Sequence, residues 1–259
     1  MRLNVDNLTF RYNLEKTVFQ NISFSLNEGE CLFLLGPNGI GKTTLFKVLL
    51  GILKADKGNI TLDNKDISSW TRKKVAQFIG YVPQHHNPPF SYTVLEVVLM
   101  GRTPHLNKFD MPSKSDEQIA LNAIESVGLS HLANKSYTNI SGGERQLVLI
   151  ARALTQQPKI LIMDEPTSNL DFGNQFKVMN HLQTLTKMGI GVIISTHMPD
   201  HAIRYGSKAA LMKNCVIYSL GDPNEVINKQ NIKELYNIDS ELINVQVSDE
   251  NKFKVCIPY

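Results

Sequence analysis

The sequence predicts an α/β protein with a mostly parallel sheet, an N-terminal antiparallel layer and a helical insert. Short unbroken apolar runs at residues 31–35, 160–163 and 192–194 are typical of parallel strands that are buried on both faces. Apolar and polar residues alternate through much of residues 3–26, which predicts strands with one buried face. Helical patterns occupy most of residues 85–157, so we expect the insert to be helical.

Length and composition favour one compact domain. The 259 residues exceed a typical domain, yet one α/β core with a smaller helical lobe accounts for them. Apolar residues make up 42% of the chain and charged residues 20%, which argues against a disordered or fibrous protein. We expect one domain over residues 1–259, with a core at about 1–84 and 158–259 and the insert at about 85–157.

The charge balance and the pattern of apolar residues argue against several classes of protein. A net charge of +3, without a block of Lys or Arg, gives no support to nucleic-acid binding. The N-terminus lacks the pattern of a signal peptide, and no apolar stretch reaches about 18 residues, so we expect neither secretion nor a membrane span. Cys31, Cys215 and Cys256 are widely spaced inside apolar runs, and we expect buried free thiols.

Two capping boxes mark helix starts in the insert. Thr93 is followed by Glu96, and Ser141 is followed by Glu144, each pair standing directly before a run of apolar residues. In a capping box the hydroxyl and the carboxylate satisfy main-chain N–H groups that the first helical turn leaves free. Both pairs therefore predict helices within the insert.

The C-terminal part of the chain returns to strand patterns. Apolar runs at residues 209–212 and 216–220 flank Lys-Asn at residues 213–214, which predicts a hairpin with its turn at that dipeptide. Apolar residues alternate again at 243–247 and 253–257, so we expect further strands there.

A glycine-rich loop carries the strongest functional signal. Residues 36–43, Gly-Pro-Asn-Gly-Ile-Gly-Lys-Thr, match the phosphate-binding loop and stand between a predicted strand and a predicted helix. Glycines let the loop curl so that main-chain N–H groups converge on a phosphate at the start of a helix. Lys42 is expected to reach the β- and γ-phosphates of ATP, and the Thr43 hydroxyl to bind Mg²⁺. The motif predicts a P-loop NTPase core. Its ATP-binding residues are expected to be Gly36, Pro37, Asn38, Gly39, Ile40, Gly41, Lys42, Thr43 and Thr44.

Two acidic residues follow the apolar run at 160–163. Asp164 is expected to hold Mg²⁺ through its waters, and Glu165 to polarise the attacking water as general base. A helix N-cap is the alternative interpretation of two acids after a strand. The phosphate loop in the same chain favours the catalytic interpretation.

Residues 141–145, Ser-Gly-Gly-Glu-Arg, resemble the signature motif that separates ATP-binding cassette (ABC) ATPases from other phosphate-loop proteins. Ile140 stands where that family usually has leucine. The N–H groups of Gly142 and Gly143 would form an anion site at a helix start, and a purely structural cap does not require two glycines. The resemblance implies that Ser141, Gly142 and Gly143 meet the γ-phosphate bound by an opposite subunit, in a head-to-tail dimer that encloses two ATP molecules.

Four further positions match the family pattern, and their roles are those that the resemblance implies. Tyr12 would stack on adenine, and Gln84 would sense Mg²⁺ and the attacking water. Asp171 belongs to a loop at residues 168–171 that crosses to the partner subunit, and His197 would contact the γ-phosphate. Glu165, His197 and Gln84 are thus the expected catalytic residues, and Thr43, Gln84 and Asp164 the expected Mg²⁺ site.

Two looser segments look like the importers for ferric siderophores, haem, cobalamin and related metal chelates, including molybdate. They are residues 97–105, after the glutamine, and residues 196–202, after the last parallel strand. The resemblance implies an ATP-hydrolysing importer subunit at the cytoplasmic face of the membrane. Its expected partners are a second copy, permease subunits and, indirectly, a substrate-binding protein.

A surface for the permease is expected between Gln84 and Arg102. Pro88 and Pro89 interrupt helix formation there and leave Phe90 in a loop, which suits contact with a partner helix.

Two other functions stay open at this point. A soluble mechanochemical ABC ATPase of DNA repair or translation is one. Such proteins carry a coiled-coil insertion or two cassettes, whereas this chain has one cassette and no sustained heptads between Lys42 and Ser141. A non-catalytic nucleotide-binding regulator is the other, and the presence of Glu165 and His197 argues against it.

Overall fold

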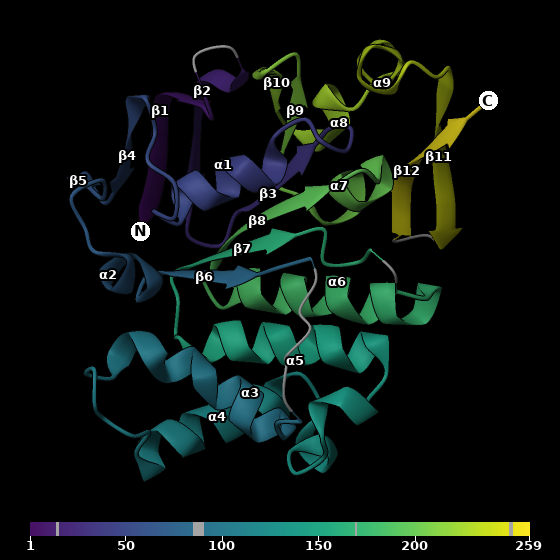
Figure 1. Cartoon of the computed structure of the whole chain (residues 1–259). Helices are drawn as coiled ribbons and strands as arrows, with labels where there is room; N and C mark the ends of the chain where they lie inside the picture. Colours follow the sequence, from purple (N-terminus) through teal and green to yellow (C-terminus); the bar gives the residue numbers. More distant parts are fainter. Residues whose placement is uncertain (14–15, 85–90, 169, 249–250) are drawn as a thin grey trace.

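A six-stranded sheet forms the centre of the molecule (Figure 1) in the computed structural model, which describes residues 1–13, 16–84, 91–168, 170–248 and 251–259. Its strand order is β10-β9-β3-β8-β7-β6, and every neighbouring pair is parallel except β9 and β10. The strands are β3 (Cys31–Leu35), β6 (Ile79–Val82), β7 (Ile160–Asp164), β8 (Gly191–Thr196), β9 (Lys208–Lys213) and β10 (Val216–Gly221). The mostly parallel sheet that the apolar runs predict is confirmed.

A second, antiparallel sheet has the order β2-β1-β4-β5 and confirms the expected N-terminal layer. Leu3 pairs with Leu26 on one side and with Leu62 on the other, so alternate residues of each strand face the interior. Helix α1 (Lys42–Leu49) contributes buried residues to the same apolar cluster as this sheet. The strands are β1 (Arg2–Arg11), β2 (Thr17–Asn27), β4 (Lys57–Leu62) and β5 (Lys65–Asp66).

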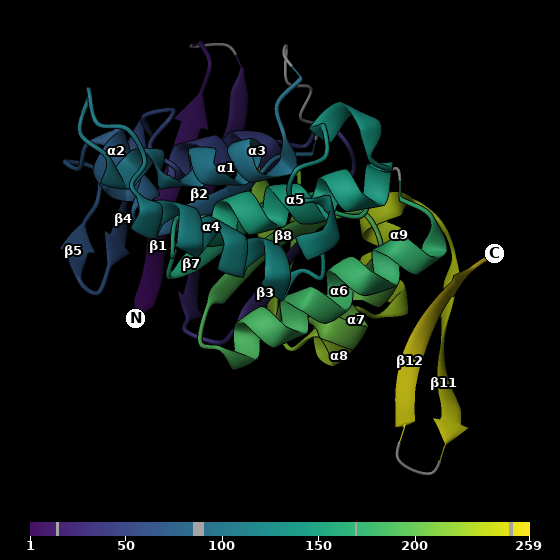
Figure 2. The same ribbon diagram turned by 90° about the horizontal axis from the view of Figure 1, so that it is seen from below.

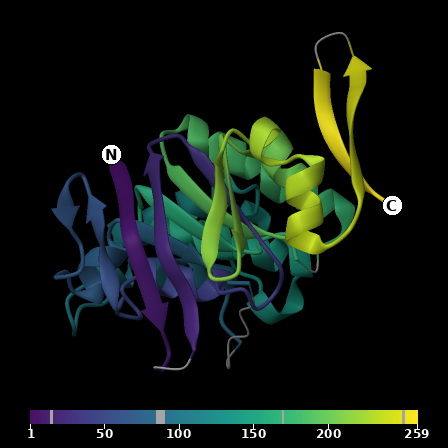
Figure 3. The same ribbon diagram turned by 90° about the horizontal axis from the view of Figure 1, so that it is seen from above.

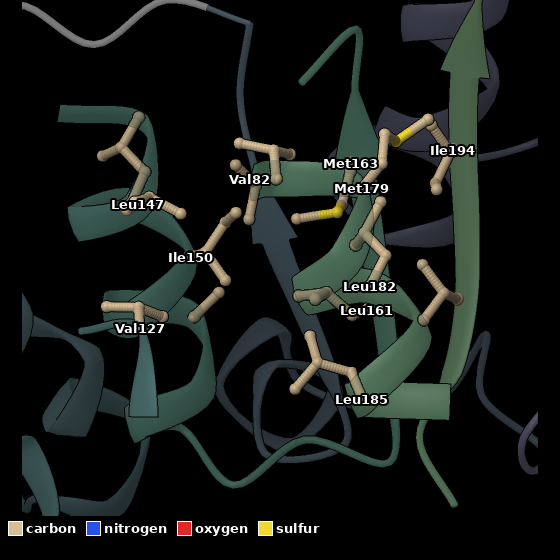
Figure 4. Packing of buried hydrophobic residues seen from close by; sticks show 14 of the residues in the cluster. Val82, Val127, Leu147, Ile150, Leu161, Met163, Met179, Leu182, Leu185 and Ile194 are labelled. Carbon is tan, nitrogen blue, oxygen red and sulfur yellow. The ribbon is translucent and has the colours of Figure 1, made fainter. Parts of the chain in front are cut away.

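Helix α1 and the antiparallel sheet pack on one face of the central sheet, and helices α5 and α6 cover the opposite face (Figure 1). Apolar side chains of both helices meet those of β6, β7 and β8 in one buried cluster, part of which Figure 4 shows. In that view Leu147 and Ile150 come from α5, Met179 and Leu182 from α6, and Leu161 from β7. This packing fixes both helices against the strands whose ends carry the candidate site.

The part of the insert that the structure describes contains α3, α4 and α5, which pack against one another. Both predicted capping boxes are present, because the side chains of Thr93 and Ser141 accept main-chain N–H groups and Glu96 and Glu144 accept those of the caps. Besides α1, the helices and 3-10 turns that the structure describes are α2 (Arg72–Ala76), α3 (Val94–Leu99), η1 (Met100–His105), α4 (Lys114–Ser126), η2 (Ser130–Leu132), η3 (Tyr137–Asn139), α5 (Gly142–Thr155), α6 (Phe172–Lys187), α7 (Pro199–Tyr205), α8 (Pro223–Val226) and α9 (Lys229–Tyr236).

Strands β9 and β10 form the predicted hairpin, but its turn lies one residue later than expected. Lys213 pairs with Val216, so Asn214 and Cys215 form the turn, with φ values of 49° and 67°. A two-residue hairpin turn of this kind requires positive φ at both central residues, which asparagine tolerates. A residue other than glycine, asparagine or aspartate is uncommon at positive φ, so Cys215 was not expected in the turn. The pairing of Lys213 with Val216 places it there.

The chain ends in a second hairpin, β11 (Ser240–Ser248) and β12 (Asn251–Pro258), which projects from the rest of the molecule (Figures 2 and 3). It is attached to α7, where the Asp200 carboxylate accepts the Cys256 N–H at 2.8 Å and the Arg204 guanidinium lies 5.1 Å from the centre of the Phe253 ring. The strand patterns at 243–247 and 253–257 are thereby confirmed.

The cysteines and the helices bear on the expectations about thiols and membranes. Cys31 is a buried free thiol, whereas Cys215 and Cys256 are only half-buried, so the expectation of burial was wrong for those two. Both of these cysteines lie in the C-terminal hairpins, Cys215 in the turn between β9 and β10 and Cys256 on β12. Among the helices that the structure describes, none has the length and apolar character needed to cross a membrane.

Candidate functional site

The candidate site lies where the carboxyl ends of β3, β6, β7 and β8 meet at one edge of the central sheet. Asp164 pairs with Ser195 and Leu35 with Thr196 across parallel strands, so the residues that follow these strands emerge side by side. Open α/β sheets bind ligands at such an edge.

The phosphate loop curls around the side chain of Lys42. Gly41 caps α1 with φ of 112°, a left-handed conformation that glycine adopts without strain. The Lys42 ammonium donates to the carbonyl oxygens of Gly36 at 2.6 Å and Pro37 at 3.1 Å, and it lies 3.6 Å from Glu165 Oε1. Burial lowers the pKa of Lys42, while the charges of Glu165 and Asp164 act in the opposite direction. The loop therefore presents a buried cation directly beside a carboxylate.

Asp164 is held from both sides. Its Oδ2 atom accepts the Thr43 hydroxyl at 2.6 Å, and its Oδ1 atom accepts the Ser195 hydroxyl at 2.6 Å. Asp164 is 3% exposed, so this carboxylate has exchanged water for hydroxyl donors. The predicted neighbours Thr43 and Asp164 are thus brought together across 121 positions of the sequence.

Glu165 stands at the centre of the polar groups. The Gln84 amide donates to its Oε2 atom at 3.1 Å, and His197 Nδ1 lies 3.6 Å from the same atom. With Lys42 on Oε1, three of the site residues expected from the sequence converge on one carboxylate. Glu165 has φ of 47°, which is uncommon for a residue other than glycine and is found preferentially at functional positions.

A cavity of about 400 Å³ opens in front of these groups. Tyr12, 58% exposed, stands at its rim, with its hydroxyl 3.2 Å from Thr44 Oγ1 and its ring edge-on to Phe10. Lys16 and Val18 also line it, and neither was expected from the sequence. Lys16 directly precedes β2 of the antiparallel sheet, and Val18 lies near the start of that strand. The packing of that sheet against the central sheet brings them to the phosphate loop. The lining residues are Tyr12, Lys16, Val18, Asn38, Gly39, Gly41, Lys42, Thr43, Thr44, Gln84 and Glu165.

The signature residues lie apart from this cavity. Ser141 caps α5, and its neighbours Gly142 and Gly143 begin that helix, where N–H groups of the first turn have no acceptor within the helix. A side chain at Gly142 would meet nothing within 4 Å, whereas one at Gly143 would collide with the amide of Asn174. The close contact with Asn174 thus gives a packing reason for glycine at position 143 alone, and a structural cap still does not require two glycines.

Asp171 explains why Asn174 is so close. The Asp171 carboxylate accepts the Asn174 main-chain N–H at 2.8 Å and its side-chain amide at 2.7 Å, which caps α6 and aims Asn174 at the start of α5. Neither Asp171 nor residues 141–143 are among the described residues that line the cavity. The site residues expected from the sequence thus form two separate groups in one chain.

The oxygen atoms at the strand edge fit Mg²⁺. This ion prefers oxygen ligands, keeps several waters and takes further ligands from phosphates. The Thr43 hydroxyl and the Asp164 carboxylate adjoin one another, and the Gln84 side chain lies near the same edge. The described ranges contain no group of three or more His, Cys, Asp or Glu residues that could hold a metal ion.

A second cavity, of about 350 Å³, lies between α2, β6 and η1. Ile52 and Met100 line it and are 44% and 40% exposed. Gly101 also lines it, and a Cβ atom there would collide with the Arg152 carbonyl oxygen. Phe90 and its neighbours Pro88 and Pro89, expected to form a partner surface, lie outside the described residues.

Ser195 is the polar residue at this edge that the motifs did not reveal. It is fully buried, and its Oγ atom bonds to Asp164 and to the Glu165 N–H. The available signal was a hydroxyl inside an otherwise apolar strand, directly before Thr196 and His197.

Comparison with known proteins gives consistent similarities. Residues 19–168 match the family model described as ABC transporter. The chain is 39% identical to the molybdate import ATP-binding protein MolC of Haemophilus influenzae, over 91% of this chain and 88% of that protein. It is 37% identical to the hemin import ATP-binding protein HmuV of Hahella chejuensis, over 88% and 90%. A solved structure of a metal-chelate type ABC transporter in an inward-facing conformation matches with a TM-score of 0.88 and 36% identity, over 99% of this chain and 97% of that one.

Proposed function

The chain belongs to the ABC transporter family, and we propose that it is the ATP-hydrolysing subunit of an importer for a metal-chelate compound. As a member of that family it is an ATP-binding protein and an ATPase. The observation that carries the proposal is the convergence of Lys42, Gln84 and His197 on the Glu165 carboxylate beside the phosphate loop. We treat residues 1–259 as one ATPase domain, with residues 85–157 as its helical insert.

In the proposed reaction each of these side chains has a separate task. Lys42 binds the β- and γ-phosphates, since its buried ammonium already occupies the centre of the loop. Thr43 and Asp164 hold Mg²⁺, aided by Gln84, and the ion when bound neutralises phosphate charge. Glu165 takes the proton of the attacking water. His197, whose Nδ1 atom lies 3.6 Å from Glu165 Oε2, contacts the γ-phosphate. Tyr12 stacks on adenine at the cavity rim.

A second copy completes the site in this proposal. Residues 141–143 and Asp171 do not line the cavity of their own chain, yet the start of α5 is an exposed anion-binding helix terminus. A head-to-tail arrangement brings Ser141, Gly142 and Gly143 of one copy to the γ-phosphate held by Lys42 of the other. Two such sites form between two copies.

The permease is proposed to dock in the second cavity, at the cytoplasmic face of the membrane. Ile52 and Met100 present apolar surface there, at the side of α2 and η1. Such a groove accepts an amphipathic helix. Ile52→Asp and Met100→Asp should reduce co-purification with the permease, while Met111→Asp, at a position that is 84% exposed and outside the cavity, should not. Undiminished co-purification of both cavity variants would place the permease elsewhere.

The cargo is proposed to be an iron siderophore, haem, cobalamin or molybdate, delivered by a substrate-binding protein. The support is the similarity to a molybdate importer subunit, a hemin importer subunit and a metal-chelate type transporter. A strain without this gene should fail to accumulate one of these compounds, and the wild-type gene should restore uptake where a Lys42→Ala gene does not. Normal uptake of all four, with loss of sugar or amino-acid uptake, would contradict the assignment. A mechanochemical ATPase unconnected with transport would show no uptake defect and no permease in pull-downs.

A further inference from the structure

Ser195 connects the two acidic residues of the site. It lies on β8, directly opposite Asp164 on β7, and none of its surface is exposed. Its hydroxyl donates to Asp164 Oδ1 at 2.6 Å, and the same oxygen accepts the main-chain N–H of Glu165 at 2.9 Å. One serine side chain thus bonds to two consecutive residues for which different chemical tasks are proposed.

The bond to Asp164 selects which carboxylate oxygen faces the phosphate loop. A hydroxyl has one proton to donate, and donation to a carboxylate gives a short charge-assisted bond. Because Ser195 occupies Oδ1, the carboxylate turns Oδ2 to the Thr43 hydroxyl, 2.6 Å away. Without the serine hydroxyl, the carboxylate would keep only Thr43 among these two donors and would be free to rotate.

The bond to Glu165 supports an unusual main-chain conformation. Glu165 has φ of 47°, and such a conformation in a residue other than glycine persists only where its surroundings determine it. Its N–H is tied to Ser195, and its carbonyl oxygen accepts the Ser168 hydroxyl at 2.9 Å. The resulting turn directs the Glu165 side chain towards Gln84 rather than along β7.

We propose that Ser195 is a positioning residue for ATP hydrolysis, whose hydroxyl aims Asp164 at the Mg²⁺ site and holds Glu165 in its catalytic orientation. The proposal rests on the functions proposed for Asp164 and Glu165. Ser195 is buried behind both carboxylates and acts through them, without contact with ATP or water. A core hydroxyl with a purely structural role would contribute to folding and leave metal affinity unchanged.

The first test measures Mg²⁺ binding without hydrolysis. In the Glu165→Gln background, Mg²⁺ is titrated into protein with a fluorescent ATP analogue, and the half-saturating concentration is compared with and without Ser195→Ala. Residues that orient metal ligands typically change metal affinity or activity by about 10- to 100-fold. We expect a rise of at least about tenfold in the half-saturating Mg²⁺ concentration, with nucleotide binding in EDTA unchanged.

The second test separates positioning from stability. With Glu165 intact, Ser195→Ala should lower kcat by about 10- to 100-fold with a smaller change in the KM for ATP, and Ser195→Thr should restore both kcat and Mg²⁺ affinity because it restores the hydroxyl. Ser207→Ala is the matched control. Ser207 Oγ also accepts one main-chain N–H and donates to one oxygen, but both belong to Cys31, at the opposite end of β3. It should lower the Tm without raising the Mg²⁺ requirement.

The outcomes are distinct. A folded Ser195→Ala protein with wild-type Mg²⁺ affinity and kcat would overturn the proposal, as would a Ser207→Ala protein with the same defects. If the alanine variant does not fold, Ser195→Cys keeps the volume and provides a weaker donor, and wild-type values in that variant would likewise overturn it. Wild-type hydrolysis by Asp164→Asn or Glu165→Gln would instead contradict the proposed function itself.

Discussion

At the residue scale, Glu165 organises the candidate site. Lys42 lies 3.6 Å from one of its oxygens, while the Gln84 amide and His197 approach the other at 3.1 and 3.6 Å. The carboxylate is 11% exposed, so these interactions operate with little screening by water. Each partner comes from a different part of the chain: Lys42 begins α1, Gln84 follows β6 and His197 follows β8.

Lys42 gives the first prediction at this scale. Lys42→Ala should weaken ATP binding by at least about tenfold, because hydrogen bonds to charged groups contribute about 1.5–3 kcal/mol and 1.4 kcal/mol is tenfold in affinity. Hydrolysis should fall below detection. Equilibrium binding of a fluorescent ATP analogue measures the effect, with Lys47→Ala on the same helix as the control. Wild-type affinity in the Lys42 variant would refute the assignment of the phosphate loop.

At the element scale, a buried ion pair joins η1, α4 and α5. Arg102 Nε donates to Asp116 Oδ1 at 2.8 Å, and its Nη1 donates to the Thr155 carbonyl oxygen at 2.9 Å. Both side chains of the pair are about one-tenth exposed, at 9% and 12%. Arg102 belongs to residues 97–105, which resemble the importer subfamily. Its buried contacts give this arginine a structural role as well.

The second prediction tests this ion pair. Arg102→Ala should lower the free energy of unfolding by about 3 kcal/mol, since removal of one partner leaves a buried charge without compensation. Lys233→Ala is the control, because Lys233 and Asp239 form an ion pair with side chains 48% and 56% exposed, and its loss should cost at most about 1 kcal/mol. Urea unfolding followed by circular dichroism compares the two. Equal losses would show that the Arg102 pair is no more than a surface contact.

The third prediction concerns acid. Hydrogen bonds from the Ser113 hydroxyl and N–H, followed by that from Arg102, lower the pKa of Asp116 from 3.8 to about 2. Its folded pKa is below its unfolded value, so its contribution to stability is complete above the unfolded pKa and is lost as pH falls towards about 2. The urea midpoint should therefore fall less steeply over this acid range in Asp116→Asn than in the wild type. If the urea midpoints of the two proteins fell in parallel with pH, the lowered pKa of Asp116 would be contradicted.

At the scale of the whole molecule, the two groups of site residues do not meet within one chain. The described cavity residues come from the phosphate loop, the N-terminal layer and the strand ends, whereas residues 141–143 begin α5. The hairpin of β11 and β12 adds contacts around α7, which follows His197, through Asp200 and Arg204. In the proposed assembly a second copy would unite the two groups.

The fourth prediction joins hydrolysis to that assembly. Glu165→Gln should retain ATP binding and slow hydrolysis by about a hundredfold or more, because the general base is lost. The retained ATP should then hold two chains together by mass action. Size-exclusion chromatography at high protein concentration should show monomer without nucleotide and dimer with ATP.

Two further variants test the location of the interface. Adding Ser141→Arg should abolish the dimer, whereas Ser130→Arg, at an exposed serine elsewhere in the insert, should not. An ATP-loaded Glu165→Gln protein that remains monomeric, or one that hydrolyses normally, would contradict the shared site.

Local patterns in the sequence were enough to predict the fold class, the phosphate loop and the helix starts at Thr93 and Ser141. These features depend on local physics: unbroken apolar runs form buried strands, glycines allow the loop to curl, and capping pairs lie three residues apart. The match of motifs to the ABC family added the expected functional positions, several of which the structure brings to one edge.

Which side chains meet depends on how the elements pack in three dimensions. The bond from Ser195 to Asp164, the lining of the cavity by Lys16, and the contact between Gly143 and Asn174 all depend on strand order, register and helix packing. These contacts join residues distant in the sequence, so no local pattern encodes them. The hairpin turn at Asn214 also follows from register, since a shift of one residue would exchange the two faces of β10.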